Sequence, residues 1–139
     1  MLRQAGTLLS IRADRPGLYD FTDEVRDFVA KSGMAEGLLT LFCRHTSASL
    51  LIHENAAPAA QRDLEAYFAR IAPQSSVYEH DEEGPDDMPA HLRTALTQTQ
   101  LSIPVQHGKP LLGTWQGIFL FEHRRNTPDR QIALHLVGE

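Results

Sequence analysis

Cysteine is almost missing from this sequence, and its scarcity excludes several kinds of protein. The single cysteine, Cys43, cannot form an intramolecular disulfide, and no CxxC pair is present to hold a metal or exchange disulfides. Cys43 lies in the apolar run LLTLFC. We therefore expect it to be a small core residue rather than a nucleophile.

Long apolar runs are also absent. None approaches the roughly 20 residues that a helix needs to cross a bilayer. The N-terminal segment contains Arg3, Arg12 and Asp14 and has no extended apolar region, which is unlike a secretory signal peptide. These features predict a soluble, cytoplasmic protein without a membrane partner.

Positive charge is scarce as well. Lys and Arg number 13 against 18 Asp and Glu, which gives a net charge of −5. An acidic surface repels nucleic acids, so we expect no nucleic-acid partner. The basic residues that lie close together are Arg124, Arg125 and Arg130, enough to bind one phosphate but too few for a polyanion groove.

A glycine-rich nucleotide loop and a serine nucleophile elbow are missing too. Several large enzyme classes are therefore excluded. The remaining chemistry must come from the seven histidines, the carboxylates and the hydroxyl groups.

The elements that are present fit one domain spanning residues 1–139. Thr22 is the predicted N-cap of a first helix, and Gly33 is its predicted C-cap. Pro58 begins a second helix that Pro73 ends. Hydrophobic patterns and turn residues predict strands over 4–12, 18–21, 37–44, 50–52, 101–106, 113–122 and 131–137, and a third helix over 89–96.

Strands and helices intermix here without the regular alternation of a parallel fold. We therefore predict the α+β class: a single domain with a mixed, largely antiparallel sheet and helices packed on it. The segment HRRNTPDR predicts a hairpin connection, with the last two strands antiparallel to each other.

The stretch HDEEGPDDMPAH, from His80 to His91, holds two histidines and five carboxylates and is broken by glycine and proline. It should form a surface loop over 75–90, with His91 in the first turns of the next helix, facing back toward the loop. Imidazole and carboxylate donors suit a divalent metal or a proton-transfer site. A solvated acidic loop with two incidental histidines is the alternative.

His45 ends a predicted buried strand and is followed by the small, hydroxyl-rich run TSAS. Three histidines with one open position are a familiar catalytic zinc arrangement, so His45, His80 and His91 are the predicted metal ligands. Zinc is favoured, and the nearby carboxylates would also admit magnesium or manganese. His107 and His123 flank turns and are expected to be exposed.

Groups for binding and proton transfer lie at strand ends. Thr46 and Ser47 could hydrogen-bond a phosphate that Arg130 pairs with, although hydroxyls also satisfy backbone groups at turns. Trp115 could stack on a heteroaromatic ring, although a lone tryptophan is more often a core residue. The candidate proton-transfer carboxylates are Glu54, Asp87 and Glu122, with solvated strand ends as the alternative for the two glutamates.

Three segments together resemble one known family. HTSASLLIHEN, YEHDEEGPDDMPAHLR and GTWQGIFLFEHR occur in this order, and the likeness to the secondary thiamine-phosphate synthase (YjbQ-like) family extends from about residue 5 to residue 138. One departure is Ser47, where the family usually has threonine; the hydroxyl is kept.

The resemblance implies an α+β homotrimer with a site near subunit boundaries that binds a metal or an anion. The implied activity is a weak thiamine-phosphate synthase reaction that joins hydroxymethylpyrimidine diphosphate to thiazole phosphate. The family motifs fall here on His45, Asn55, His80, Asp86, Asp87, His91, Trp115, Gln116 and Glu122. A non-catalytic trimeric binder of a phosphorylated small molecule or metal, and a metal-assisted phosphoester hydrolase, use the same groups and remain alternatives.

Overall fold

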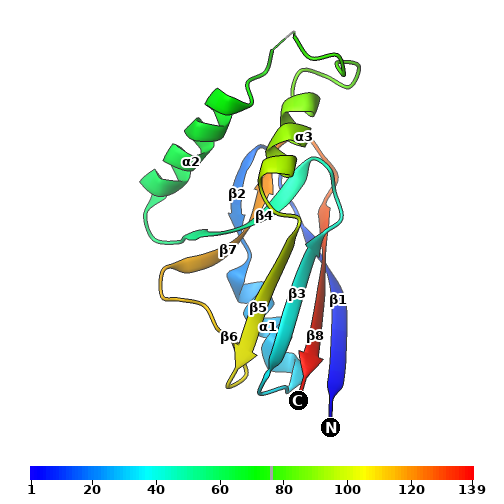
Figure 1. Ribbon diagram of the computed structural model, residues 1–139, viewed down its shortest axis with the longest axis vertical. Helices are drawn as coiled ribbons and strands as arrows, with labels where there is room; N and C mark the ends of the chain where they lie inside the picture. The colour runs from blue at the N-terminus through cyan, green and yellow to red at the C-terminus, as the bar shows by residue number, and fades with distance from the viewer. Residues whose placement is uncertain (76) are drawn as a thin grey trace.

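The computed structural model describes residues 1–75 and 77–139; position 76, inside the predicted acidic loop, lies outside them. Figure 1 shows the arrangement of the helices and strands. In chain order the elements are β1 (Arg3–Ile11), β2 (Gly17–Asp20), α1 (Thr22–Ser32), β3 (Gly37–Cys43), β4 (Ala48–Glu54), α2 (Pro58–Ile71), α3 (Asp87–Leu96), β5 (Gln100–Gln106), β6 (Lys109–Pro110), β7 (Gln116–Glu122) and β8 (Arg130–Gly138).

The strands form two sheets. One has five strands in the order β1-β8-β3-β5-β6, and the other has three in the order β2-β7-β4. Neighbouring strands are antiparallel in both. The predicted α+β class is confirmed, and its strands are divided between two layers.

The predicted hairpin between the last two strands is wrong. β7 pairs with β2 and β4, whereas β8 pairs with β1 and β3 in the other sheet. Burial explains the separation: β7 is buried at every position after Gln116, so both its faces are covered, whereas β8 alternates between buried and more exposed residues. A strand covered on both faces suits the interior of the fold, and an alternating strand suits a sheet with one open face.

The core lies between the two sheets and α1. Side chains on the inner face of the five-stranded sheet alternate with outward ones, as the period of a strand requires. The inward residues include Leu39, Leu41, Leu101, Ile103, Ile132, Leu134 and Leu136. Val25 and Val29 of α1 are fully buried against this core. Each such aliphatic side chain stabilises the fold by about 1.5–3 kcal/mol.

α1 begins one residue earlier than predicted, because Thr22 is its first residue and not its N-cap. The Thr22 hydroxyl donates to Asp20 Oδ1 at 2.6 Å, and its oxygen accepts the Ile118 N–H at 2.9 Å. Thr22 therefore joins the helix to β7 instead of capping it. The predicted C-cap is confirmed: Gly33 adopts the left-handed conformation, with φ of 70°.

α2 occupies the predicted residues but stands away from the core. Phe68 is its one buried residue, although Tyr67 and Ile71 lie on the same predicted apolar face and remain 49% and 44% exposed. Figure 1 shows α2 beside the upper part of the molecule, with the connection to α3 at that end and both termini at the opposite end.

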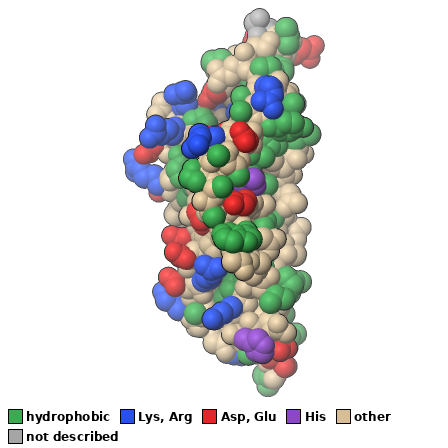
Figure 2. All heavy atoms as spheres, turned by 90° about the vertical axis from the view of Figure 1, so that its left-hand side faces the viewer, with side chains coloured by type: hydrophobic (Ala, Val, Ile, Leu, Met, Phe, Trp, Pro, Cys, Tyr) green, Lys and Arg blue, Asp and Glu red, His purple; other side chains and the backbone are tan. Residues whose placement is uncertain are grey.

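Figure 2 shows the side of the molecule on which α2 lies. Basic and acidic side chains are interspersed down this face rather than gathered into one basic patch. The expectation that nucleic acid is not a partner stays a prediction. No described helix is both long and apolar enough to cross a membrane.

Candidate metal centre

Four potential metal-ligand side chains converge where the acidic loop meets α3. His80 and Glu83 come from the loop, and Asp87 and His91 come from the first turns of α3. One donor atom from each lies within 4.8 Å of all the others. Asp87 and His91 share a helix face because they are four residues apart, so the start of α3 at Asp87 creates half of the group.

Asp87 is the centre of this group. Its side chain is only 4% exposed, and its Oδ2 lies 2.9 Å from His80 Nε2 and 3.1 Å from His91 Nε2, within hydrogen-bond distance of both. Burial alone would raise the pKa of Asp87. The charge of His91, the His80 hydrogen bond and Arg124 outweigh burial and hold the pKa below its ordinary value. Asp87 is therefore a carboxylate at neutral pH.

The contact between His91 and Asp87 depends on which ring nitrogen of His91 carries a hydrogen. His91 Nδ1 lies 2.8 Å from the backbone oxygen of Thr46, which can only accept, so Nδ1 carries a hydrogen. In a neutral ring, Nε2 would then present a lone pair to Asp87 Oδ2, which is also an acceptor. Either a second ring proton or a metal ion resolves this contact.

The chemistry of the four donor side chains also fits a metal. Two imidazoles and two carboxylates form a four-ligand set suited to a divalent transition metal. The Thr46 carbonyl fixes the His91 tautomer in the way that an outer hydrogen-bond partner does for a metal-binding histidine. The group can therefore bind a metal.

Arg124 fixes the loop beside this group. Its Nη2 donates to the Glu83 carbonyl at 2.7 Å and to Asp86 Oδ1 at 3.2 Å, and its Nη1 lies 3.1 Å from Asp87 Oδ1. These contacts raise the pKa of Arg124, with the Asp86 hydrogen bond as the main cause. Arg124 thus balances part of the negative charge and holds Glu83 near the centre.

His45 lies near this centre but outside the four-residue group. Its Nε2 accepts the Gln131 N–H at 2.9 Å, so the neutral ring carries its hydrogen on Nδ1. Burial is the main cause that lowers the pKa of His45, which keeps the ring neutral. Metal binding through Nδ1 would move that hydrogen and break the Gln131 contact, so the structure favours His45 as a hydrogen-bond donor.

A pocket of about 660 Å³ opens beside the centre. The pocket is lined by His45, Thr46, His91, Thr94, Ala95, Thr97 and Thr99. His45 reaches the pocket from the loop between β3 and β4, and His91 reaches it from α3. The pocket therefore lies between the HTSAS segment and the end of the acidic loop. The lining offers hydroxyl and imidazole groups but neither Lys nor Arg, so an anion bound here would depend on the metal centre for neutralising charge.

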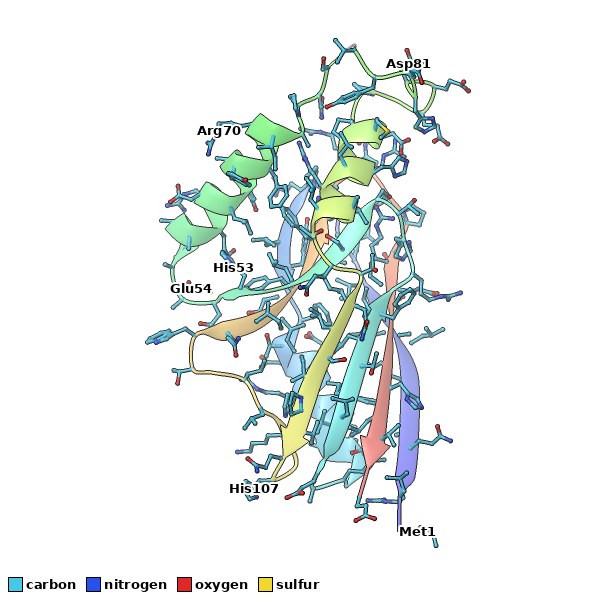
Figure 3. All side chains as sticks on the ribbon, viewed as in Figure 1. Met1, His53, Glu54, Arg70, Asp81 and His107 are labelled. Carbon is cyan, nitrogen blue, oxygen red and sulfur yellow. The ribbon has the colours of Figure 1, made fainter. Side chains whose placement is uncertain are left out.

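Several other predicted proton-transfer and substrate-binding residues lie away from this pocket: Glu54, Asn55, Trp115 and Gln116. Glu54 is at the far end of β4 from the HTSAS segment, about 20 Å away at ~3.3 Å per residue. In Figure 3 the labelled Glu54 lies near the lower end of α2, away from Asp81 at the top of the molecule. The Asn55 N–H donates to the Trp115 carbonyl at 3.1 Å, and Glu54 is paired with Gln116 across the sheet.

Two of these side chains, Glu54 and Gln116, support local structure. Glu54 Oε2 accepts the N–H groups of Ala56 and Ala57, which orders the chain before α2. The Gly113 N–H donates to Gln116 Oε1 at 2.8 Å. Trp115 precedes β7 instead of belonging to it and is 64% exposed, so it is not a core residue. Within one chain, none of them reaches the pocket beside the metal centre.

Glu122 and Arg130 form a buried ion pair. The Arg130 Nε and Nη2 atoms each donate to the Glu122 carboxylate at 2.6 Å. Glu122 is fully buried, and it also accepts from Thr127 and from two backbone N–H groups. The geometry does not support Glu122 as a base or Arg130 as a phosphate ligand, because each already neutralises the other. Arg130 Nη2 also donates to Ser47 Oγ, which orients the HTSAS segment.

The prediction that His123 is exposed is wrong. The side chain is 1% exposed, and its Nε2 lies 3.0 Å from Ser49 Oγ, which is also buried. Burial lowers the pKa of His123 to about 3, so the ring is neutral. His123 directly follows β7, whose last residues are buried, and the chain becomes exposed only at Arg125.

Two residues of the site were missed by sequence reasoning. Glu83 looked like one of five equivalent loop carboxylates, and Arg124 looked like a possible phosphate ligand. The spacing HxxE in the loop and the position of Arg124 at the end of the GTWQGIFLFEHR segment were the available signals. The fold alone places that segment's end against the loop.

Comparisons with known proteins identify the family of this chain. The family described as "UPF0047 protein YjbQ-like" matches residues 7–139 of the chain. The chain belongs to the YjbQ-like family. A YjbQ-like relative, the UPF0047 protein of Synechocystis sp., is 46% identical over 138 residues, covering 99% of this chain and 94% of the relative. UPF0047 protein YjbQ of Escherichia coli O157:H7 is 42% identical over 132 residues, covering 94% of this chain and 96% of the relative.

Solved structures of YjbQ-like proteins have the same fold. A protein of unknown function from Sulfolobus solfataricus P2 has a TM-score of 0.86 at 27% identity, covering 100% of this chain and 99% of that chain. An uncharacterised YjbQ/UPF0047 family protein from Clostridium acetobutylicum has a TM-score of 0.83 at 31% identity, covering 95% and 98%. These likenesses show the YjbQ-like fold over the whole of this chain.

Proposed function

We propose that this chain is a cytoplasmic metal-dependent enzyme that acts on a phosphorylated small molecule in the pocket beside His91. The convergence of His80, Glu83, Asp87 and His91 on one point carries the proposal. Zinc is the favoured metal because two of the four donors are imidazoles, and the two carboxylates would also admit manganese or magnesium.

The reaction that the family resemblance implies is a thiamine-phosphate synthase transfer from hydroxymethylpyrimidine diphosphate to thiazole phosphate. A divalent metal supplies the positive charge that a departing diphosphate needs. The chain's own groups bind and orient the substrate: His45 donates its Nδ1–H, and Thr46 and Thr99 offer hydroxyls. Arg124 keeps the acidic loop in place.

A non-catalytic binder is the second candidate, and one observation favours it. The residues that line the pocket include no carboxylate, and Glu54 and Glu122 are engaged elsewhere in the fold. Proton transfer in the pocket would then fall to His45 or to the metal-binding carboxylates. A metal-assisted phosphoester hydrolase would also depend on His45 or on these carboxylates for proton transfer.

We also propose self-association, with a trimer as the state that the resemblance implies. The outer face of the five-stranded sheet supports it, because none of the described helices covers that face and Leu8, Leu38 and Phe42 are 55%, 50% and 47% exposed there. Assembly through this or another face could bring Trp115 and Asn55 of one copy near the pocket of another.

Elemental analysis of protein purified without chelators tests the metal site. We expect about one metal per chain in the wild type and in His45→Ala, and a loss of most of it in His91→Ala and Asp87→Asn. His45→Ala is the matched control, because its ring lies beside the pocket but outside the four-residue group. A metal-free wild type, or metal retained in both His91→Ala and Asp87→Asn, would refute the site.

Product analysis tests the reaction. The wild type, supplied with hydroxymethylpyrimidine diphosphate and thiazole phosphate, should give thiamine phosphate, and His91→Ala should not. Release of inorganic phosphate without thiamine phosphate would identify a hydrolase. Binding without turnover would identify the non-catalytic binder.

A further inference from the structure

A second, smaller cavity lies away from the metal centre. Its volume is about 170 Å³, and it is bounded by the segment that begins β2, by α2, by α3 and by β7. The lining residues are Pro16, Gly17, Glu65, Phe68, Arg93, Phe121 and Glu122. Arg93 follows His91 by two positions on α3, so it projects from a different side of the helix.

Arg93 brings an uncompensated positive charge to this cavity. Its Nη2 donates to the Ala72 carbonyl at 2.9 Å, but its Nε is buried without a hydrogen-bond partner. In the described part of the chain, no carboxylate lies within ion-pair distance of the Arg93 guanidinium. Burial is the main cause that lowers the pKa of Arg93. A partly buried charge of this kind is costly unless an anionic group meets it.

Glu65 brings the opposite charge to the same cavity. The residue is exposed, and its Oε1 lies over Gly17, 3.4 Å from where a side-chain carbon would be at that glycine. Glu122 also lines the cavity, but Arg130 neutralises its carboxylate. The Arg93 guanidinium and the Glu65 carboxylate therefore remain available to bind a charged ligand.

Two aromatic rings form the apolar part of the wall. Phe68 and Phe121 pack edge to face, with ring centroids 5.5 Å apart at 84°. Aromatic rings tolerate an ammonium group beside them as well as aliphatic atoms. The cavity therefore offers a guanidinium for a carboxylate, a carboxylate and rings for an ammonium, and an apolar surface for a short carbon chain.

The size restricts the ligand. The cavity has on the order of ten times the volume that one water molecule needs, so one water satisfying Arg93 Nε would leave most of it unused. It is also smaller than the ~300 Å³ at which pockets for drug-sized ligands begin. A compound of a few heavy atoms fits these limits.

We propose that this cavity binds a small zwitterion that carries one carboxylate and one ammonium group, such as a free amino acid with a short side chain. Arg93 binds its carboxylate, and Glu65 binds its ammonium group. The site is independent of the metal and of the reaction proposed above.

Calorimetric titration with alanine, propionate and ethylamine tests this inference, because the last two carry one charged group of alanine each. We expect alanine to bind at least about ten-fold more tightly than either, since each charged hydrogen bond contributes about that factor. Arg93→Gln should weaken alanine binding by about ten-fold or more. Glu65→Gln should reduce alanine to the level of propionate.

Arg70→Gln is the matched control, because Arg70 is exposed on α2 and does not line the cavity. Glu65 is exposed, so Glu65→Gln tests the site even if Arg93→Gln does not fold. Propionate binding as tightly as alanine would overturn the zwitterion assignment. Alanine binding that neither variant changes, or no heat with any probe, would overturn the site and leave a cavity that holds water only.

Discussion

The buried pair of Glu122 and Arg130 leads to a quantitative prediction. Glu122 is fully buried, and among the described residues five hydrogen bonds end on its carboxylate, two of them from Arg130 at 2.6 Å. Glu122→Gln keeps the shape but removes the charge, so Arg130 is left buried without a counter-charge. Removing one partner of a buried ion pair costs about 3–5 kcal/mol.

That cost is large for a chain of 139 residues. A domain of this size has a free energy of unfolding of about 5–15 kcal/mol, so the variant loses about a fifth of it or more. The midpoint of thermal unfolding should fall by about 10–25 °C, at ~3–5 °C for each kcal/mol.

Urea unfolding followed by circular dichroism, at a fixed protomer concentration, measures this loss. Glu54→Gln is the matched control, because among the described residues the Glu54 carboxylate accepts only from backbone N–H groups near the surface, so this variant should lose about 0.5–1.5 kcal/mol. A Glu122→Gln variant within 1 kcal/mol of the wild type would refute a structural role for the pair. Loss of activity at unchanged stability would instead support a catalytic role for Glu122.

Three further predictions follow from burial and exposure. The unfolded chain protonates His123 near pH 6.5 but the native chain only near 3. The contribution of His123 to the unfolding free energy should therefore fall by about 1.4 kcal/mol for each unit by which the pH is lowered from 6.5 to 3. His123→Gln should remove that slope in urea titrations. Burial raises the pKa of Cys43 to about 11, so alkylation at pH 8, followed by mass spectrometry, should be about 100-fold slower than for a free thiol. Phe42→Lys should lower the mass measured by light scattering if the open sheet face joins subunits, whereas Lys109→Glu should leave it unchanged; an unchanged mass for Phe42→Lys would exclude that face.

Local sequence patterns determined much of the secondary structure. Pro58 and Pro73 bracket α2, Gly33 ends α1, and the apolar run from Gly37 forms β3 as predicted. These signals are local because a cap, a proline or an alternating pattern acts within a few residues. The distribution of strands between two sheets is not local, and so the predicted hairpin between β7 and β8 failed.

The candidate site was predicted in part. His80, Asp87 and His91 come together because the acidic loop and the first turns of α3 are adjacent in sequence. Glu83 and Arg124 could not be assigned roles, because Arg124 is 37 positions beyond Asp87 and meets it only in the folded chain. Glu122 and Arg130 looked available for chemistry until the fold placed each against the other.

The sequence alone determined the family, the α+β class and the loop that carries the candidate metal ligands, because these depend on residue types at short and fixed spacings. The tertiary structure alone decided which donors meet, which charges are already paired, and that His45 faces the pocket as a neutral hydrogen-bond donor. Those outcomes depend on burial and on contacts between distant segments, and only the packing of β7, β8 and α3 sets them.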